Sequence, residues 1–135
     1  TTSLTTMLKM KLRFPLEKLE DVETWFSPYI ELGSLPGNLG CPVGPAATEM
    51  SPSNEMVRAE ARRQFERWEQ KIAEDLAGLA EKEGFGHSYC ARTEARNLAC
   101  SIQGAFMFGR VFQDRNFIVE VRDNLVRDLK RRFRP

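Results

Sequence analysis

The stretch that decides the fold is TEARNLACSIQGAFMFGRVFQ, residues 93–113. Its apolar residues fall on two opposite sides of a single helix. One apolar arc consists of Ala95, Leu98, Ala99, Ile102, Ala105, Phe106, Gly109 and Phe112. The reverse side has a narrower apolar stripe of Cys100, Gly104, Met107 and Val111. A helix on the surface of a single domain needs one buried face, so the second stripe predicts contact with another subunit.

A long helix is expected before this stretch, from Asn54 to about Glu83, where there is no proline. Asn54 suits the N-cap position, and Gly84 is the natural stop. Its apolar residues recur at helical spacing and are Ala61, Phe65, Trp68, Ile72, Leu76 and Leu79. Thr93 is expected to cap the helix that follows. The opposite, charged side predicts solvent-exposed pairs such as Arg62 with Glu66 and Lys71 with Asp75.

The last helix is expected to begin at Asp114 or Asn116 and to end near Phe133. The link before it is two or three residues long, so the two final helices should form an antiparallel hairpin. Two such hairpins around a two-fold axis would form a four-helix bundle. The residues predicted to lie in this dimer interface are Cys100, Gly104, Met107, Val111, Ile118, Val121 and Leu125.

The front of the chain is also predicted to be helical. Leu4 to Phe14 has a helical pattern, and Leu16 to Leu32 is expected to form a helix interrupted at Ser27-Pro28. Residues 33–52 are rich in glycine and proline and predict a loop, with at most a short helix over residues 46–50. No segment shows convincing strand alternation. We therefore expect an all-α domain of about five to six antiparallel helices, occupying residues 1–135.

Composition narrows the class of protein. The 135 residues carry a formal net charge of +1, whereas nucleic-acid-binding modules usually have a clear basic excess. The apolar fraction of 41% is typical of a folded globular protein, and no run approaches the roughly 20 apolar residues of a membrane span. The three cysteines show no C-x-x-C spacing, which favours reduced thiols and a cytoplasmic location.

Candidate catalytic and metal-binding groups are few. The only histidine, His87, lies near Tyr89 and Cys90, but no third group to orient a Cys–His pair is evident. A metal site built from His87, Cys90 and Cys41 matches no known ligand spacing. A basic tail, Lys130, Arg131, Arg132 and Arg134, suits the C-terminal end of a helix better than a nucleic-acid contact. We expect no catalytic residue, no metal and no cofactor, and a small helical enzyme using His87 is the last of the alternatives.

Aromatic side chains from separate segments form the remaining candidate site. Trp25, Tyr29, Phe65, Trp68 and Phe106 could line an apolar cavity, with Gln103 as its polar anchor. The same residues could equally be a packed core. On that second interpretation the chain is a helical oligomerisation module without a pocket.

Three motifs in order resemble a known family. Gly40-Cys41-Pro42-Val43-Gly44 followed by Glu49 is similar to the "GCPVG…E" segment of TetR/AcrR-type transcriptional regulators. Phe65-Glu66-x-Trp68 resembles the long helix after that segment, and Gln103-Gly104-Ala105 with Gly109-Arg110 resembles the interface helix of the family. The resemblance runs from about Leu16 to Phe133, and the multidrug-responsive subgroup is the nearest type.

The resemblance implies a C-terminal domain of a repressor, which binds a small apolar effector and forms a homodimer. It implies that DNA is bound only through an N-terminal helix-turn-helix domain missing from this chain, and that residues 1–14 are the end of the helix connecting the two. It further implies a short helix over Cys41 to Met50. No membrane partner is expected.

Overall fold

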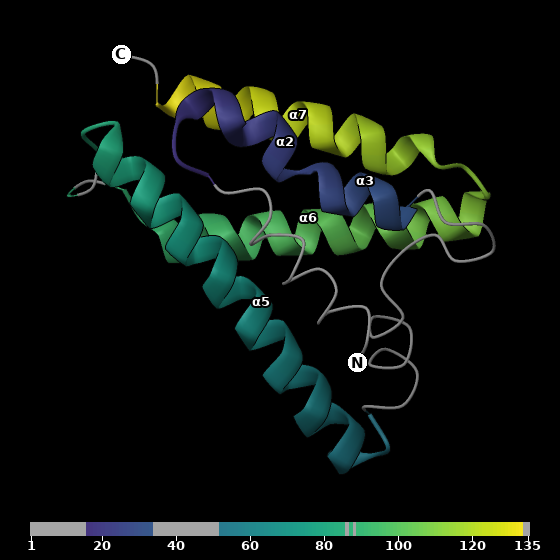
Figure 1. The fold of residues 1–135 in the computed structure, drawn as a ribbon. Coiled ribbons are helices and arrows are strands. Elements are labelled where there is room, and N and C mark those ends of the chain that lie inside the picture. Colours follow the sequence, from purple (N-terminus) through teal and green to yellow (C-terminus); the bar gives the residue numbers. More distant parts are fainter. Residues whose placement is uncertain (1–15, 34–51, 86, 88, 134–135) are drawn as a thin grey trace.

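The computed structural model describes residues 16–33, 52–85, 87 and 89–133, and these residues contain helices and no strand (Figure 1). The predicted all-α class is confirmed. In chain order the elements are η1 (Leu19–Asp21), α2 (Val22–Trp25), α3 (Ser27–Gly33), α5 (Glu55–Lys82), α6 (Ala91–Phe112) and α7 (Asn116–Arg132). None of these helices combines the length and apolar character that crossing a membrane requires.

α6 is the central helix of the described fold and contacts α3, α5 and α7. α6 and α7 lie side by side as an antiparallel hairpin, as the short link predicted (Figure 1). α5 crosses α6 at an angle, and its N-terminal half extends away from the hairpin. The short helices α2 and α3 contact α7, and α3 also reaches α6.

The long helix α5 begins and ends where the sequence predicted. The Oδ1 of Asn54 accepts a hydrogen bond from the backbone N–H of Val57 at 3.1 Å, which satisfies one free donor of the first turn. At the other end Gly84 has φ +84°, a left-handed conformation that favours glycine. The backbone N–H of Phe85 then donates to the carbonyl of Ala80 at 2.7 Å and closes the helix.

The start of α6 differs from the prediction. The helix begins at Ala91 with Cys90 as its N-cap residue, so Thr93 lies in the first turn instead of capping it. The Oγ1 of Thr93 lies 3.1 Å from the Sγ of Cys90, and this contact uses the hydroxyl expected to cap the helix. Sequence reasoning overlooked cysteine because the usual N-cap residues carry an oxygen acceptor.

The turn between α6 and α7 is tight. Gln113 adopts a left-handed conformation at φ 52°, and its side-chain amide donates to the carbonyl of Arg110 at 2.7 Å. Asp114 then accepts a hydrogen bond from the backbone N–H of Asn116 at 2.9 Å, which starts α7. α7 ends with Phe133 as its C-cap residue, as expected.

The N-terminal segment is interrupted close to the predicted place. The break falls at Phe26, one residue before Ser27, and separates η1 and α2 from α3. Pro28 lies in the first turn of α3, where a missing backbone N–H leaves no helical hydrogen bond unmade. The helix predicted for Leu4 to Phe14 and the short helix near residues 46–50 lie outside the described residues.

The open end of the hairpin, opposite the α6–α7 turn, is fixed by polar and aromatic contacts. Glu94, a buried carboxylate in the first turn of α6, forms an ion pair with Arg132 in the last turn of α7. The ring of Tyr89 packs on that of Phe133 with centroids 5.0 Å apart, and Phe85 lies 5.8 Å from the same ring. These contacts close the end of the bundle at which α6 starts and α7 finishes.

Candidate functional site

The two sides of α6 have different surroundings. Seven of the eight residues of the predicted inner arc are buried, and Ile102 and Phe106 have 1% of their surface exposed. On the outer side Cys100 is exposed, Met107 is 51% exposed and Val111 is 73% exposed. Gly104 lies between them and is half-buried. The outer stripe is therefore an apolar surface that the described residues of this chain leave open to solvent.

Two glycines of α6 have different structural requirements. A Cβ atom added at Gly109 would lie 3.0 Å from the backbone oxygen of Asp114, so the turn into α7 needs glycine there. A Cβ atom added at Gly104 would meet no atom of the described residues within 4 Å. Packing among those residues therefore does not explain the glycine in the middle of the outer stripe. A close approach by a second backbone would explain it.

Phe112 corrects the predicted inner arc, because it is 62% exposed. The helix ends at this residue and leaves the core at the Gln113 turn. Phe112 instead stacks on Phe108, with ring centroids 6.0 Å apart and planes 5° apart, and both rings contact Phe117. Three phenylalanines close to the α6–α7 turn are the sequence signal for this cluster, and Phe108 belongs to neither of the two predicted apolar sides of the helix.

The predicted interface residues of α7 are less exposed than those of α6. Val121 and Leu125 are half-buried against the core. Ile118 is only 3% exposed and is covered by its own chain, so it presents almost no surface to a partner. The open apolar surface therefore lies mainly on α6 and at the α6–α7 turn.

The predicted aromatic residues come together where α2 and α3 meet α5. The indole N–H of Trp68 donates to the hydroxyl of Tyr29 at 3.0 Å, and their rings lie 5.9 Å apart. Phe65 packs beside Trp68 at 6.3 Å. The indole N–H of Trp25 donates to the Oδ2 of Asp75 at 2.9 Å. Phe26 lies between Trp25 and Tyr29 in this cluster.

The polar groups beside these rings are balanced in charge. Asp75 also accepts from Lys71 at 2.8 Å, which confirms the predicted pair on α5. Burial, with a further contribution from the charge of Asp75, raises the pKa of Tyr29 well above its usual range. Tyr29 is therefore an uncharged phenol at neutral pH. The outer pair Arg62 and Glu66 is also present, at 2.7 Å.

The two effector-site residues predicted on α6 are Gln103 and Phe106, which lie one helical turn apart. Phe106 belongs to the buried core. Gln103 is half-buried, and its side-chain Nε2 is fully covered yet has no hydrogen-bond partner among the described residues. A buried donor without an acceptor costs free energy, so this atom requires an explanation.

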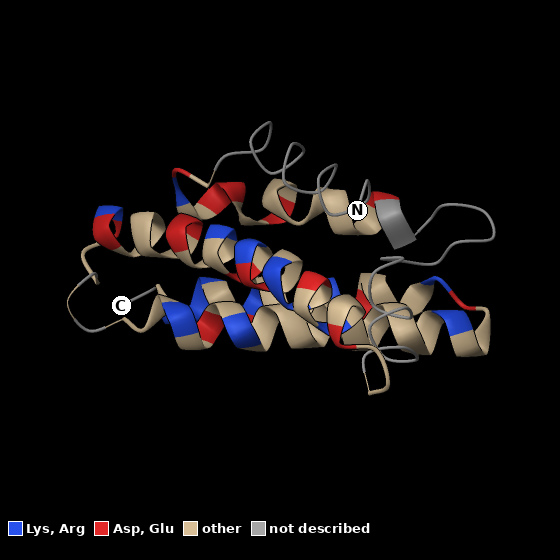
Figure 2. Cartoon of the chain, turned by 90° about the horizontal axis from the view of Figure 1, so that it is seen from below, with Lys and Arg blue, Asp and Glu red and all other residues tan. Residues whose placement is uncertain are grey.

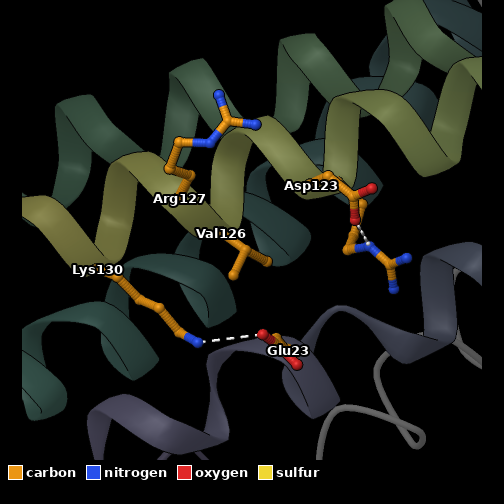
Figure 3. Close-up of a pocket in the computed structure, with 6 residues that line it drawn as sticks. Glu23, Asp123, Val126, Arg127 and Lys130 are labelled. Carbon is orange, nitrogen blue, oxygen red and sulfur yellow. Dashed lines mark hydrogen bonds and ion pairs between the residues drawn. The ribbon is translucent and has the colours of Figure 1, made fainter.

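Two surface grooves lie elsewhere. One, of about 430 Å³, separates α2 from α7 and is lined by Glu23, Arg122, Asp123, Val126, Arg127 and Lys130 (Figure 3). Lys130 pairs with Glu23 across it at 3.1 Å, and Arg122 pairs with Asp123 at 2.6 Å. The other, of about 410 Å³, lies between α5 and α6 and contains the ion pair of Arg96 and Glu69. Neither groove includes a predicted aromatic site residue.

The candidate catalytic residues that the structure describes, His87 and Cys90, lie in the connector before α6. His87 and Cys90 are both exposed, and the thiol of Cys90 interacts with Thr93, which lowers its pKa through hydrogen bonding. Cys41 lies outside the described residues. Within the described part of the chain no three His, Cys, Asp or Glu residues gather as metal ligands.

The charged residues follow the expected pattern. Figure 2 shows acidic and basic residues alternating along α5 and basic residues gathered toward the end of α7. Two cations of this basic end are engaged within the chain, Lys130 with Glu23 and Arg132 with Glu94. This agrees with the interpretation of the tail as a helix terminus.

Comparison with known proteins identifies the family. The model of the domain described as "Transcriptional regulator LmrA/YxaF-like, C-terminal domain" matches residues 34–124, which is more than half of the chain and includes all of α5 and α6. Searches of curated proteins and of solved structures gave no match. The chain belongs to the LmrA/YxaF-like family of TetR transcriptional regulators and comprises their C-terminal domain.

Proposed function

We propose that this domain binds a small apolar effector and forms the homodimer of a TetR-type transcriptional repressor. DNA binding would belong to a helix-turn-helix domain of the whole repressor. The domain itself would act as a cytoplasmic regulator and not as an enzyme. Membership of the family supports this role.

The observation that carries the homodimer is the outer stripe of α6. Met107 and Val111 are exposed on the face opposite the core, and Gly104, one turn before Met107 on the same stripe, leaves room for another backbone. The exposed rings of Phe108 and Phe112 extend this surface toward the turn. A contiguous apolar surface of this kind marks an interaction site. A second copy fits it, because a two-fold axis would place the same stripe on both sides of one interface.

The effector would bind at the aromatic cluster of Trp25, Tyr29, Phe65, Trp68 and Phe106, with Gln103 as a polar contact. An effector that prefers one of two domain arrangements would shift the equilibrium between them. In the whole dimer that shift would alter the separation of two DNA-binding domains, which must lie about 34 Å apart to occupy successive major grooves. A coupling free energy of about 1–3 kcal/mol would change DNA affinity roughly 5- to 150-fold.

The homodimer is tested by sedimentation of the purified chain over a range of micromolar concentrations. We expect a dimer in this range, and a monomer throughout would overturn the proposed interface. The repressor role is tested with the whole protein, by measuring operator binding with and without an effector that raises the melting temperature of this domain. Operator affinity that does not respond to such an effector would contradict the proposal.

A second candidate function is a helical oligomerisation module without a pocket. The observation that favours it is the close packing of the aromatic cluster, where Trp25, Tyr29 and Trp68 are each 1% exposed. A ligand that binds only the native state must stabilise it. This candidate therefore predicts that no flat aromatic probe raises the melting temperature.

A further inference from the structure

The groove between α2 and α7 lies outside the proposed effector site and carries a net positive charge (Figure 3). Three of the side chains that line it are cations, Arg122, Arg127 and Lys130, and two are carboxylates, Glu23 and Asp123. The formal charge of the lining is therefore +1. Arg127 points away from the pair of Glu23 and Lys130, which leaves Arg122 and Lys130 as the cations available to a ligand in the groove.

Arg122 occupies a position on the core-facing side of α7, where the helical pattern calls for an apolar residue. Residues three or four positions apart lie on the same side of a helix. Ile118 and Val126, four positions before and after Arg122, are buried in the hydrophobic core, and Val119 packs against that core. The side chain of Arg122 is only 27% exposed. The charge of this guanidinium is therefore mostly covered, which costs free energy unless a partner compensates it.

The carboxylates that compensate these two cations lie mainly in solvent. Arg122 donates through Nε to the Oδ1 of Asp123 at 2.6 Å, and the side chain of Asp123 is 57% exposed. Lys130 is 25% exposed and donates at 3.1 Å to Glu23, whose side chain is 66% exposed. The two terminal nitrogens of Arg122 form no hydrogen bond among the described residues. Because ion pairs with an exposed partner contribute little to stability, a ligand anion can replace either carboxylate at small cost.

The floor and the charge of the groove limit the kind of anion that fits it. Val126 lies midway between Arg122 and Lys130 on α7, about 6 Å along the helix axis from each, so one small ligand can reach both cations. A carboxylate matches the flat fork of a guanidinium with two parallel hydrogen bonds. A single negative charge neutralises the lining, and the side chain of Val126 gives a hydrocarbon group an apolar surface to contact.

From this arrangement we propose that the groove between α2 and α7 binds a small organic monocarboxylate with a compact apolar body. The oxygens of the ligand accept hydrogen bonds from Arg122 and Lys130, and its apolar body lies against Val126. Binding replaces Glu23 as the partner of Lys130 and so releases one tie between α2 and α7. The site is separate from the aromatic cluster, and it requires neither the effector site nor the homodimer.

The test measures binding of cyclohexanecarboxylate to the full chain by titration followed with two-dimensional NMR. Cyclohexanecarboxamide has nearly the same shape without the charge, and inorganic phosphate has the charge without the apolar body. We expect the carboxylate to bind at least about tenfold more tightly than the carboxamide, because charge-assisted hydrogen bonds are stronger than neutral ones. Phosphate should bind more weakly than the carboxylate. The affinity for the carboxylate should fall at high ionic strength, and the amides of α2 and α7 should shift most.

Variants assign the binding to the two cations. Arg122→Met and Lys130→Met each keep an unbranched side chain and remove one charge, and each should weaken binding of the carboxylate about tenfold. Glu23→Gln removes the carboxylate that competes for Lys130 and should tighten binding several-fold. Arg131→Met, at an exposed position of the same helix, changes the net charge equally and is the matched control, which should bind as the unaltered chain does. Far-ultraviolet circular dichroism checks that each variant is folded.

Several results would overturn the proposal. They are equal binding of the carboxylate and the carboxamide, equal losses in the Arg122→Met and Arg131→Met variants, phosphate binding as tight as that of the carboxylate, and weaker binding by Glu23→Gln. Absence of saturable binding at tens of millimolar carboxylate would do the same. Because the groove contains none of the aromatic residues of the effector site, each of these results leaves the proposed function standing.

Discussion

The two faces of α6 are similarly apolar in sequence but have different roles in the structure. The inner face is covered by the helices of its own chain, and Ile102 and Phe106 are almost completely buried. The outer face carries Met107 and Val111, which are exposed, and Gly104, which has open space beside it among the described residues. Apolar periodicity therefore identifies both faces but does not say which is covered by the chain itself. Substitutions on each face therefore separate effects on the stability of the monomer from effects on dimerisation.

The largest effect is expected from Gly104→Arg on the outer face. An unpaired charge buried in an interface costs about 3 kcal/mol or more, and two-fold symmetry would place two arginines in one interface. Sedimentation should show a monomer with an unchanged far-ultraviolet circular dichroism spectrum, because the site has room for a side chain within the chain. Ala77→Arg, at an exposed position of α5, is the control and should remain dimeric. A dimeric Gly104→Arg variant would remove this stripe from the interface.

Phe106→Ala should have the largest effect on the inner face. Removing a fully buried phenylalanine ring costs about 3–5 kcal/mol of stability. Urea denaturation in the Gly104→Arg background measures this cost without a contribution from dimerisation. Val111→Ala in the same background is the outer-face comparison and should change stability by less than about 0.5 kcal/mol. Similar losses for the two variants would contradict the assignment of the faces.

Gly109→Ala should lower stability by roughly 1–3 kcal/mol, because the added methyl group would crowd the backbone oxygen of Asp114. Gly104→Ala is its matched control. In the monomeric state it should be neutral or slightly stabilising, since alanine favours helix more than glycine does. Thermal unfolding of the two variants gives the comparison directly. Equal effects of both substitutions would show that Gly109 has no special role in the turn.

Met107→Ser should have the smallest effect of the four. It removes apolar surface from the outer face and should weaken dimerisation by about tenfold, with little change in the stability of the monomer. Concentration-dependent sedimentation measures the dimer, and urea denaturation in the Gly104→Arg background measures the monomer. A loss of monomer stability comparable to that of Phe106→Ala would place Met107 in the core.

Most of the fold could be predicted because its signals are local. The boundaries of α5 follow from Asn54 and Gly84, whose capping roles depend on their own side chain or backbone. The start of α6 was misplaced because Cys90 is an unusual N-cap and Thr93 contacts its thiol. Phe112 was misassigned because helical periodicity continues to the last turn, whereas the packing partners do not.

The candidate site could be predicted only in part. The aromatic residue type alone indicates that Trp25, Tyr29 and Trp68 lie near one another, because large aromatic side chains concentrate in cores. Their hydrogen bonds could not be predicted, since the bond between Trp25 and Asp75 joins residues 50 positions apart. The covered amide of Gln103 likewise depends on how separate helices meet, which a single periodic pattern does not specify.

The fluorescence emission of the two tryptophans reports on the packing of the helices around them. Trp25 and Trp68 are the only two tryptophans of the chain, and both indoles lie in the contact between α5 and the α2–α3 segment. Their emission should be blue-shifted in the native state and should move to longer wavelength when that contact opens. Because neither lies on α6, the emission follows separation of α5 from α2 and α3 without any added dye.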